Sequence, residues 1–247
     1  MSSLYLYAII RSTASLPDLP DDVTGVGGTS LHAVTEAPLA AIASPTPDGK
    51  LRPRRRNLKA HHDVIKRLAA TETVLPMAFG VVAESDDHVR AFLDTHAEPL
   101  TGQLAALDGH VEIGFRVRWN VDDIFAHFVE QYDELRSLRD AFFGESGSAS
   151  RGEMIQLGEQ FEALLNAERS AHQSTLESYL APVCQRIEAD DPRNETEAAN
   201  LACLVARDAV DAFETAVHNA AEEFNDVFTF TYTDPMAPYS FADVEFD

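Results

Sequence analysis

Residues 51–80, LRPRRRNLKAHHDVIKRLAATETVLPMAFG, decide how the first part of the chain folds. The stretch begins with a basic segment, since five of the chain's 19 arginines and lysines lie at positions 52–59. Pro53 predicts that this segment is not helical, because the proline ring fixes φ and disfavours the helical conformation of the residue before it. The stretch is therefore expected to open with a basic loop.

A helix and a short strand are predicted after the basic loop. Asn57 is a residue type that caps helices, and the following residues repeat at helical spacing until about Thr71. The repeating positions are Leu58, His61, Ile65 and Leu68. Residues 73–75 then predict a short strand. We expect the helix and the strand to pack together, with one of the adjacent histidines His61 and His62 on the buried helix face.

The remainder of the chain alternates between predicted strands and helices. Apolar and polar residues alternate at 111–119, which is the clearest strand signal, and Ser85 is the expected N-cap of a helix. Other strands are predicted at 4–10, at 227–233 and twice within 31–44, and other helices at 121–142, 153–188 and 208–224. Residues 201–205 fit a strand or a helix. This order predicts an α+β fold.

The predicted domain boundary lies at Asp108-Gly109. We expect an N-terminal α+β domain at residues 1–109 and a ferredoxin-like C-terminal domain at residues 110–247, with long inserted helices and a closing tail. A chain of 247 residues is long enough for two domains, each with its own core. Residues 144–152, GESGSASRG, have the composition of a flexible loop.

The chain is strongly acidic, with a formal net charge of −22 and lysine only at Lys50, Lys59 and Lys66. An acid-rich, lysine-poor surface stays hydrated where salt screens repulsion, which predicts a saline cytoplasm. The same charge argues against nucleic-acid binding. Neither a membrane-spanning segment nor a secretory signal is predicted. Cys184 and Cys203 are expected to be buried free thiols of a reducing compartment.

The sequence contains no Gly-x-Ser-x-Gly motif, no phosphate-binding loop with a lysine and no zinc-type cysteine pair. The glycine-rich segment Gly25–Gly28 lacks the third glycine of a dinucleotide fingerprint and is expected to be a loop. Glu168 and His172, like Glu214 and His218, are four residues apart and could share a helix face, but two ligands are too few for a metal site. The sequence therefore predicts no catalytic site, no metal and no cofactor.

Two segments are candidates for binding a partner protein. The arginines of the basic segment could bind carboxylates and carbonyls inside the fold, or they could form a docking surface for an acidic or carbonyl-rich partner. The apolar segment at 235–241 could be tied across a domain face, or it could present aromatic side chains to a partner. The candidate residues are Arg52, Arg54, Arg55, Arg56, Pro235, Pro238, Tyr239 and Phe241.

The order of several motifs resembles the gas vesicle accessory family GvpF/GvpL over nearly the whole chain. The motifs are LYLYAII at 4–10, RPRRRNL with the following histidine pair and VLPMAFG, IQLGE at 155–159 with Arg169, and DPMAPYSF at 234–241. With the acidic composition, the chain is identified as a member of the halophilic archaeal type. The resemblance implies that residues 201–205 form a strand and that the second domain is a modified ferredoxin fold.

The family resemblance also implies a function. It predicts a non-enzymatic accessory or minor structural protein that binds the hydrophobic major shell protein and supports gas vesicle assembly. The expected partners are the major shell protein and other gas vesicle accessory proteins, and the expected location is the gas vesicle and the cytoplasm. The alternative is a scaffold module that binds only other accessory proteins.

Overall fold

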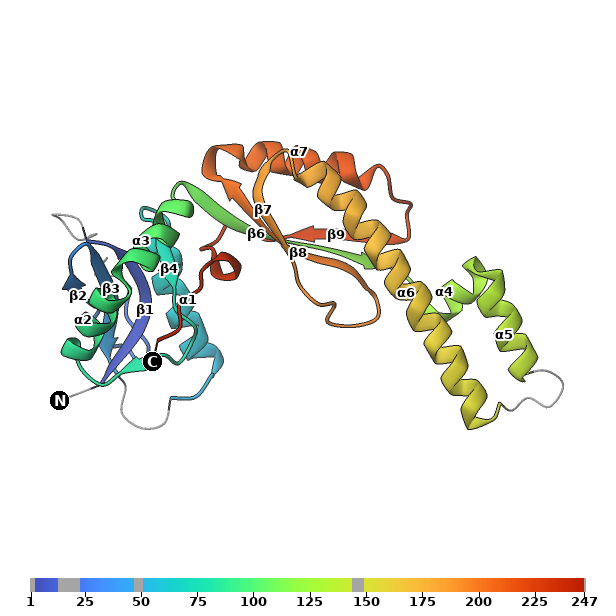
Figure 1. The fold of residues 1–247 in the computed structure, drawn as a ribbon, viewed down its shortest axis with the longest axis horizontal. Coiled ribbons are helices and arrows are strands. Elements are labelled where there is room, and N and C mark those ends of the chain that lie inside the picture. Colours follow the sequence, from blue (N-terminus) through green and yellow to red (C-terminus); the bar gives the residue numbers. More distant parts are fainter. Residues whose placement is uncertain (1–2, 13–22, 47–50, 144–148, 247) are drawn as a thin grey trace. The chain divides into compact units, whose positions relative to one another are not determined.

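The computed structural model describes residues 3–12, 23–46, 51–143 and 149–246. The chain divides into two compact units, each with its own β-sheet (Figure 1). The first unit holds Met1–Glu112 and Asp234–Asp247, and the second holds Ile113–Thr233. Across the described ranges, no helix combines the length and the apolar character needed to cross a membrane.

The closing tail belongs to the first unit, whereas the sequence placed it in a second domain at residues 110–247. The carboxylate of Glu112 accepts hydrogen bonds from the backbone N–H of Ser240 at 2.7 Å and from its hydroxyl at 2.8 Å. The backbones of Glu112 and Met236 also pair in both directions at 2.9 Å. These contacts join residues far apart in the chain, so no local pattern could have revealed them.

The sheet of the first unit is antiparallel around a central strand. The strands are β1 (Leu4–Arg11), β2 (His32–Glu36), β3 (Leu39–Pro45), β4 (Val74–Pro76) and β5 (Val82–Ala83). Their order is β2-β3-β1-β4, and β5 pairs with β1 as well. The strand predictions at 4–10, at 73–75 and within 31–44 are confirmed.

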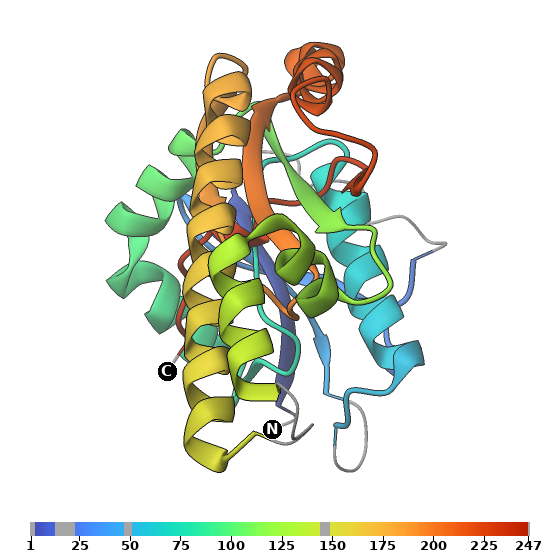
Figure 2. The ribbon, with the colours of Figure 1, turned by 90° about the vertical axis from the view of Figure 1, so that its right-hand side faces the viewer.

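Helices cover both faces of this sheet. They are α1 (Arg55–Ala69), α2 (Asp86–Thr95) and α3 (Ala97–Ala106). Figure 2 shows α1 on one side of the blue strands and the green pair α2 and α3 on the other. Since both faces are covered, residues 4–10 of β1 are all buried. The Ser85 hydroxyl accepts the His88 N–H at 3.2 Å, which confirms Ser85 as the N-cap of α2.

The helix α1 begins at Arg55, so the prediction that Asn57 caps it is wrong. Arg54 is at the N-cap position, and its carbonyl accepts the N–H groups of Asn57 and Leu58 at 2.8 and 3.0 Å. Proline fixes its own φ and disfavours the helical conformation of the residue before it, but it does not restrict the residues after it. Arg54 still has extended backbone angles (φ −80°, ψ 146°), and the helix begins at the next residue. The Asn57 side chain instead donates a hydrogen bond to the Arg52 carbonyl at 2.9 Å.

A hydrogen-bonded group of rings holds α1 against the sheet. His61 is 5% exposed, and its Nε2 donates to the Met77 carbonyl at 3.1 Å. Its Nδ1 therefore accepts from the Tyr5 hydroxyl at 2.9 Å. Burial lowers the pKa of His61 to about 4, so the ring is neutral near pH 7. His62 is exposed, which confirms that one histidine of the pair packs on the buried face.

The loop that contains Gly25 packs on the same group of rings. The Tyr7 hydroxyl hydrogen-bonds with Ser44 Oγ at 2.9 Å and accepts the Val26 N–H at 2.7 Å. A Cβ on Gly25 would lie 2.4 Å from that hydroxyl, so glycine is required by close packing. The glycine-rich segment is a loop, as predicted, and its glycine serves this contact.

The second unit has a four-stranded sheet with the order of a ferredoxin-like fold. Its strands are β6 (His110–Trp119), β7 (Cys184–Ala189), β8 (Glu197–Ala206) and β9 (Phe228–Tyr232). The spatial order β7-β8-β6-β9 corresponds to 2-3-1-4 in chain order, and helices separate β6 from β7 and β8 from β9. The predicted α+β class and the strand at 201–205 are confirmed.

The second unit has four helices, α4 (Ile124–Gln131), α5 (Asp133–Phe143), α6 (Arg151–Leu180) and α7 (Val210–Ala221). The helices α6 and α7 cover one face of its sheet, and α4 and α5 pack against α6. Figure 1 shows α6 and α7 along the sheet, and Figure 2 shows α4 and α5 beside α6. Alternate residues of β6, such as Phe115 and Val117, pack into a core with Leu176 and Phe213 from these helices. Short 3₁₀ turns lie at Arg207–Ala209 and Tyr239–Phe241.

Two predicted helices of the second unit have different limits in the structure. The helix predicted at 121–142 is two helices, because Tyr132 has extended backbone angles (φ −114°, ψ 108°). The helix predicted at 153–188 ends at Leu180, two residues before Pro182, and the chain continues as β7. Of the predicted flexible loop at 144–152, residues 144–148 lie outside the described residues.

Candidate functional site

The arginines of the basic segment lie around the first turn of α1. The side chains of Arg52, Arg54, Arg55 and Arg56 are all exposed. Among the described residues, no carboxylate forms an ion pair with any of the four. The interpretation that these arginines bind carboxylates inside the fold therefore has no support in the described ranges.

The electrostatics of this helix end are unfavourable for the protein alone. The N-terminus of a helix carries a partial positive charge, so cations there are destabilising and anions are stabilising. The first turn of α1 has two arginines and no acidic residue, whereas its last turn has Lys66 and Arg67, which suit the negative end. The first turn thus concentrates positive charge on an exposed surface of a chain whose net charge is −22.

A shallow hollow of about 250 Å³ adjoins this positive surface. Arg56 and Lys59 line it together with Val23, Thr24 and other residues of α1. The basic segment therefore combines exposed guanidinium groups with a recess beside them.

The closing tail is held against the first unit by its apolar residues. Pro238 is buried and Phe241 is 6% exposed, although the sequence put both forward as partner contacts. Tyr239 is half-buried, and burial together with Glu112 raises the pKa of its hydroxyl to about 12. Only Pro235 among the four tail candidates is exposed. The tail is therefore an anchored segment, and Pro238 and Phe241 could contact a partner only if it detached.

Within the described residues, no polar contact is seen between the arginine segment and the closing tail. In the ranges that the structure describes, no hydrogen bond or ion pair links the side chains of Arg52–Arg56 to residues 235–241. Each segment must therefore be tested separately.

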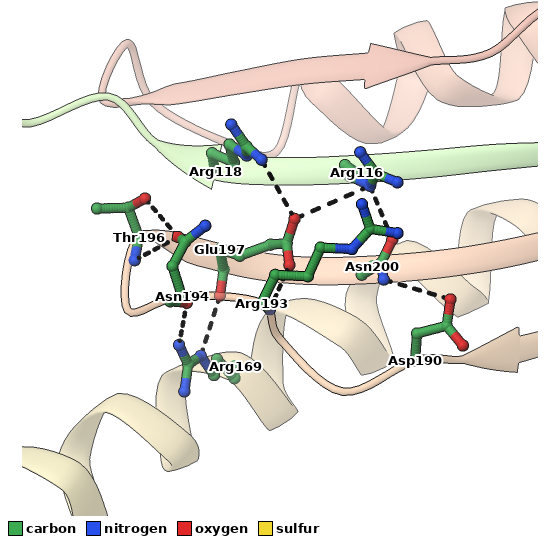
Figure 3. Close-up of polar contacts among 9 residues, drawn as sticks. All are labelled: Arg116, Arg118, Arg169, Asp190, Arg193, Asn194, Thr196, Glu197 and Asn200. Carbon is green, nitrogen blue, oxygen red and sulfur yellow. Dashed lines mark hydrogen bonds and ion pairs between the residues drawn. The ribbon is translucent and has the colours of Figure 1, made fainter. Parts of the chain in front are cut away.

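The structure shows a second group of arginines in the second unit, which the sequence analysis did not identify (Figure 3). Its centre is Glu197, whose side chain is fully buried (0% exposed). Its carboxylate lies 3.5 Å from Arg118 and 3.9 Å from Arg116, and it accepts the Arg193 N–H at 2.7 Å. The guanidinium groups of Arg116 and Arg118 on β6 thus balance the buried negative charge of Glu197 on β8.

Arg169 extends this network to the helix α6. Its guanidinium donates hydrogen bonds to the carbonyls of Asn194, Glu195 and Glu197 at 3.0, 3.2 and 3.0 Å. Figure 3 shows the bonds to Asn194 and Glu197. Arg169 thereby provides hydrogen-bond donors for the backbone carbonyls around the turn before β8, and it connects that turn to α6. Arg116 and Arg118 alternate along a strand that the sequence did predict, and this was the available signal for the network.

Metal-ligating residues do not gather in the described part of the chain. Within those residues, no group of three or more His, Cys, Asp or Glu side chains could hold an ion. Glu168 and His172 do meet, with Oε2 and Nε2 at 3.1 Å. Cys184 and Cys203 are not joined by a disulfide, and Cys184 is only half-buried, contrary to the expectation that both are buried.

Comparison with known proteins identifies the family. The model of the family described as gas vesicle synthesis protein GvpL/GvpF matches residues 3–243. The chain belongs to this family. It is 31% identical to "Gas vesicle protein F" of a Streptomyces species and 26% identical to "Gas vesicle protein F" of Dolichospermum flosaquae. Both matches span 98% of this chain and nearly all of the relative, at 100% and 98%.

Solved structures support the same fold. The crystal structure of gas vesicle protein GvpF from Anabaena sp. PCC7120 superposes with a TM-score of 0.82 at 23% identity, over 99% of this chain and 100% of that chain. The structure of GvpF from Microcystis aeruginosa gives the same values. The family relationship connects the chain with gas vesicles as an accessory protein.

The narrower expectation of a halophilic archaeal type is not supported. "Gas vesicle protein F" of Haloferax mediterranei is 22% identical over 98% of this chain, below the values for the Streptomyces and Dolichospermum proteins. Acidic composition reflects the medium in which a surface is hydrated. It is therefore a poor marker of lineage.

Proposed function

We propose that this chain is a non-enzymatic accessory protein that binds the hydrophobic major shell protein of gas vesicles and supports their assembly. Free subunits of a small apolar shell protein would associate unproductively through their exposed apolar surface. A folded binder with a net charge of −22 would keep such a complex soluble through charge repulsion. Its place of action would be the cytoplasm and the growing vesicle.

The exposed arginine segment is the observation that carries this proposal. Arginines at the positive end of α1 do not stabilise the helix, and the described residues offer them no carboxylate. Guanidinium groups bind carboxylates and carbonyls through paired hydrogen bonds, so a partner could supply what the fold lacks. In the tail, exposed Pro235 and half-buried Tyr239 remain secondary candidates.

The test is retention of purified shell protein by tagged variants of this chain. Arg55→Ala/Arg56→Ala is compared with Lys66→Ala/Arg67→Ala, which removes the same charge from the other end of the same helix. We expect the first variant to lose most of the retained shell protein and the second to retain it like the wild type. Circular dichroism confirms that both variants fold.

Other outcomes separate the alternatives. If both variants retain the shell protein equally, the arginine segment is not the docking surface. If the wild type retains other accessory proteins but no shell protein, the chain is a scaffold module. Repeating the binding experiment at low and high KCl measures how much of the affinity for the shell protein is electrostatic, because salt screens exposed charge pairs.

The acidic composition also supports the proposal that the protein functions in a saline cytoplasm, whatever the lineage of the organism. Repulsion among 41 acidic residues weakens when salt shortens the Debye length, so the melting temperature should rise with KCl. A melting temperature that is flat or falls between low and molar KCl would contradict this part of the proposal.

A further inference from the structure

A small pocket in the second unit has aromatic walls and one carboxylate. It has a volume of about 140 Å³ and lies where the end of β6, the helices α4 and α6 and the residues before β9 meet. Its walls include the rings of Trp119, Phe128, Tyr132 and Phe228. Glu168 and His172 reach it from α6, and Gln131 and Asn225 add amide groups. We call this the aromatic pocket.

The carboxylate of Glu168 is held in place by two neutral donors. The Tyr132 hydroxyl donates to Glu168 Oε1, and burial together with Glu168 raises the pKa of that hydroxyl to about 12. His172 Nε2 lies 3.1 Å from Glu168 Oε2. Burial lowers the pKa of His172 although Glu168 acts in the opposite direction, so the ring is neutral near pH 7 and donates through Nε2. Both contacts orient the carboxylate without neutralising its charge.

Other charges near the pocket add to the negative potential. Asp123 at the N-cap of α4, Glu130 on α4 and Asp226 before β9 are exposed acids on the bordering segments. No lysine or arginine lies within α4 or residues 222–228. Arg136 on α5 reaches the end of α4, where its guanidinium donates to the carbonyls of Val129 and Glu130 and pairs with Asp133. Arg169, the nearest arginine along α6, donates to backbone carbonyls instead. His127, at the rim, is the other titratable group that faces the pocket.

The walls also favour a flat cation. Glu168 is 35% exposed and His172 is 20% exposed, so both are within reach of a ligand. The His172 ring packs against Trp119 and Phe228 with centroids 5.9 and 4.8 Å away, which fixes the walls. Aromatic faces attract cations, and a guanidinium stacks on such faces while it donates to a carboxylate.

The size of the pocket restricts what can enter. Drug-sized ligands and cofactors occupy pockets of about 300–1,000 Å³, so this pocket accepts only one small group. Arginine is enriched in protein interfaces, where its side chain often fills an aromatic recess.

We infer that the aromatic pocket receives the guanidinium group of an arginine side chain from a partner protein. The cation would lie over the rings of Trp119 or Phe228 and donate to Glu168. This surface belongs to the second unit and does not depend on the arginine segment of α1. The two surfaces therefore have opposite chemistry: one offers arginines and the other accepts one.

Trp119 makes the inference directly testable, because it is the single tryptophan of the chain. Its fluorescence is followed while N-acetylarginine amide is added to the full-length protein. We expect a saturable change with this probe, a weaker one with N-acetyllysine amide, and none with N-acetylcitrulline amide. The citrulline compound has nearly the same shape as the arginine compound but no charge.

Variants locate the response at the carboxylate. Glu168→Gln keeps the size of the side chain and removes its charge, so it should weaken binding of the arginine probe roughly tenfold. Glu159→Gln removes the same charge from an exposed position of the same helix and should bind like the wild type. Equal responses to the arginine and citrulline probes, no saturable response, or unchanged binding by Glu168→Gln would each overturn the inference.

Discussion

The two groups of arginines in this protein follow opposite rules. Arg52–Arg56 are neighbours in the sequence, yet they are exposed, and the described residues offer them no carboxylate. Arg116, Arg118 and Arg169 are scattered along the chain, yet their guanidinium groups converge on Glu197 and on the turn before β8 (Figure 3). In this protein the arginines that are clustered in the sequence lie on the surface. The arginines that pair inside the fold come from separate strands and helices, which only the tertiary structure brings together.

The energetic consequences of the two groups differ for the same reason. A fully buried carboxylate is costly unless cations and donors surround it, so the scattered arginines are required by the fold. Cations at the start of a helix interact unfavourably with the helix dipole, so the clustered arginines slightly lower the stability of the folded protein. The following experiments test this contrast, from the largest expected effect to the smallest.

Removing both cations beside Glu197 should have the largest effect. Arg116→Ala/Arg118→Ala leaves a buried charge without compensation, so we expect the free energy of unfolding to fall by about 4 kcal/mol. Urea denaturation measures this change. Adding Glu197→Gln to the double variant should restore about half of the loss. Equal stability of the double variant and the wild type would show that the Arg193 N–H alone suffices for Glu197.

Acid should destabilise the buried side of α1, in contrast to its exposed arginines. The folded pKa of His61 is about 4 and its unfolded value is 6.5, so the fold favours the neutral ring. Its contribution is complete above pH 6.5 and is lost as the pH falls towards 4, up to about 3 kcal/mol.

The control for the acid experiment is the neighbouring histidine. The unfolding free energy of His61→Gln should fall less steeply between pH 7 and 4 than that of the wild type, whereas His62→Gln should keep the wild-type slope because His62 is exposed. If the unfolding free energies of His61→Gln and the wild type fall equally steeply with pH, protonation of His61 is not the cause of the acid destabilisation.

Arg169 tests whether the fork of the guanidinium matters as well as its charge. Arg169→Ala should lower the free energy of unfolding by about 2 kcal/mol, because three carbonyls lose a charged donor. Arg169→Lys keeps the charge but cannot reach three carbonyls with one planar group, so it should recover only part of this loss. Full recovery by lysine would reduce the role of Arg169 to its charge.

The clustered arginines should give the smallest effect, and with the opposite sign. Arg55→Ala/Arg56→Ala removes two cations from the positive end of α1, so the free energy of unfolding should rise by about 0.5 kcal/mol at low salt. The gain should disappear at high KCl. A loss of more than about 1 kcal/mol would mean that these arginines stabilise the fold, contrary to the exposed positions of their side chains.

Patterns within single elements were sufficient to predict most of the strands. Alternation at 111–119 predicted β6, and β-branched and aromatic residues predicted β1 and β9, because these signals arise within one strand. The limits of α1, α4 and α6 were less predictable. The extended backbone of Tyr132 lets α5 turn onto α6. Residues 121–142 contain no proline or glycine, so the sequence has no signal for this break between two helices.

The candidate sites divide in the same way. The sequence located the basic segment and its loop, but it left open whether the arginines pair inside the fold or are exposed, and the structure shows that they are exposed. For the tail, the sequence offered both an anchored segment and a partner contact. The burial of Pro238 and Phe241 fits the anchored segment, and the anchoring contact between Glu112 and Ser240 spans 128 positions of the chain, so the sequence could not locate it. The aromatic pocket was equally hidden: Glu168 and His172 are visible as a spacing, but Trp119 and Phe228 come from other elements.

The sequence by itself determined the α+β class, most of the strands, the acidic composition and the family resemblance. Each of these depends on composition or on residues that are close in the chain. Tertiary structure alone decided which arginines are paired, where the tail is anchored and which rings enclose Glu168. These features depend on contacts between distant residues, and such contacts form only when the sheets and helices are packed.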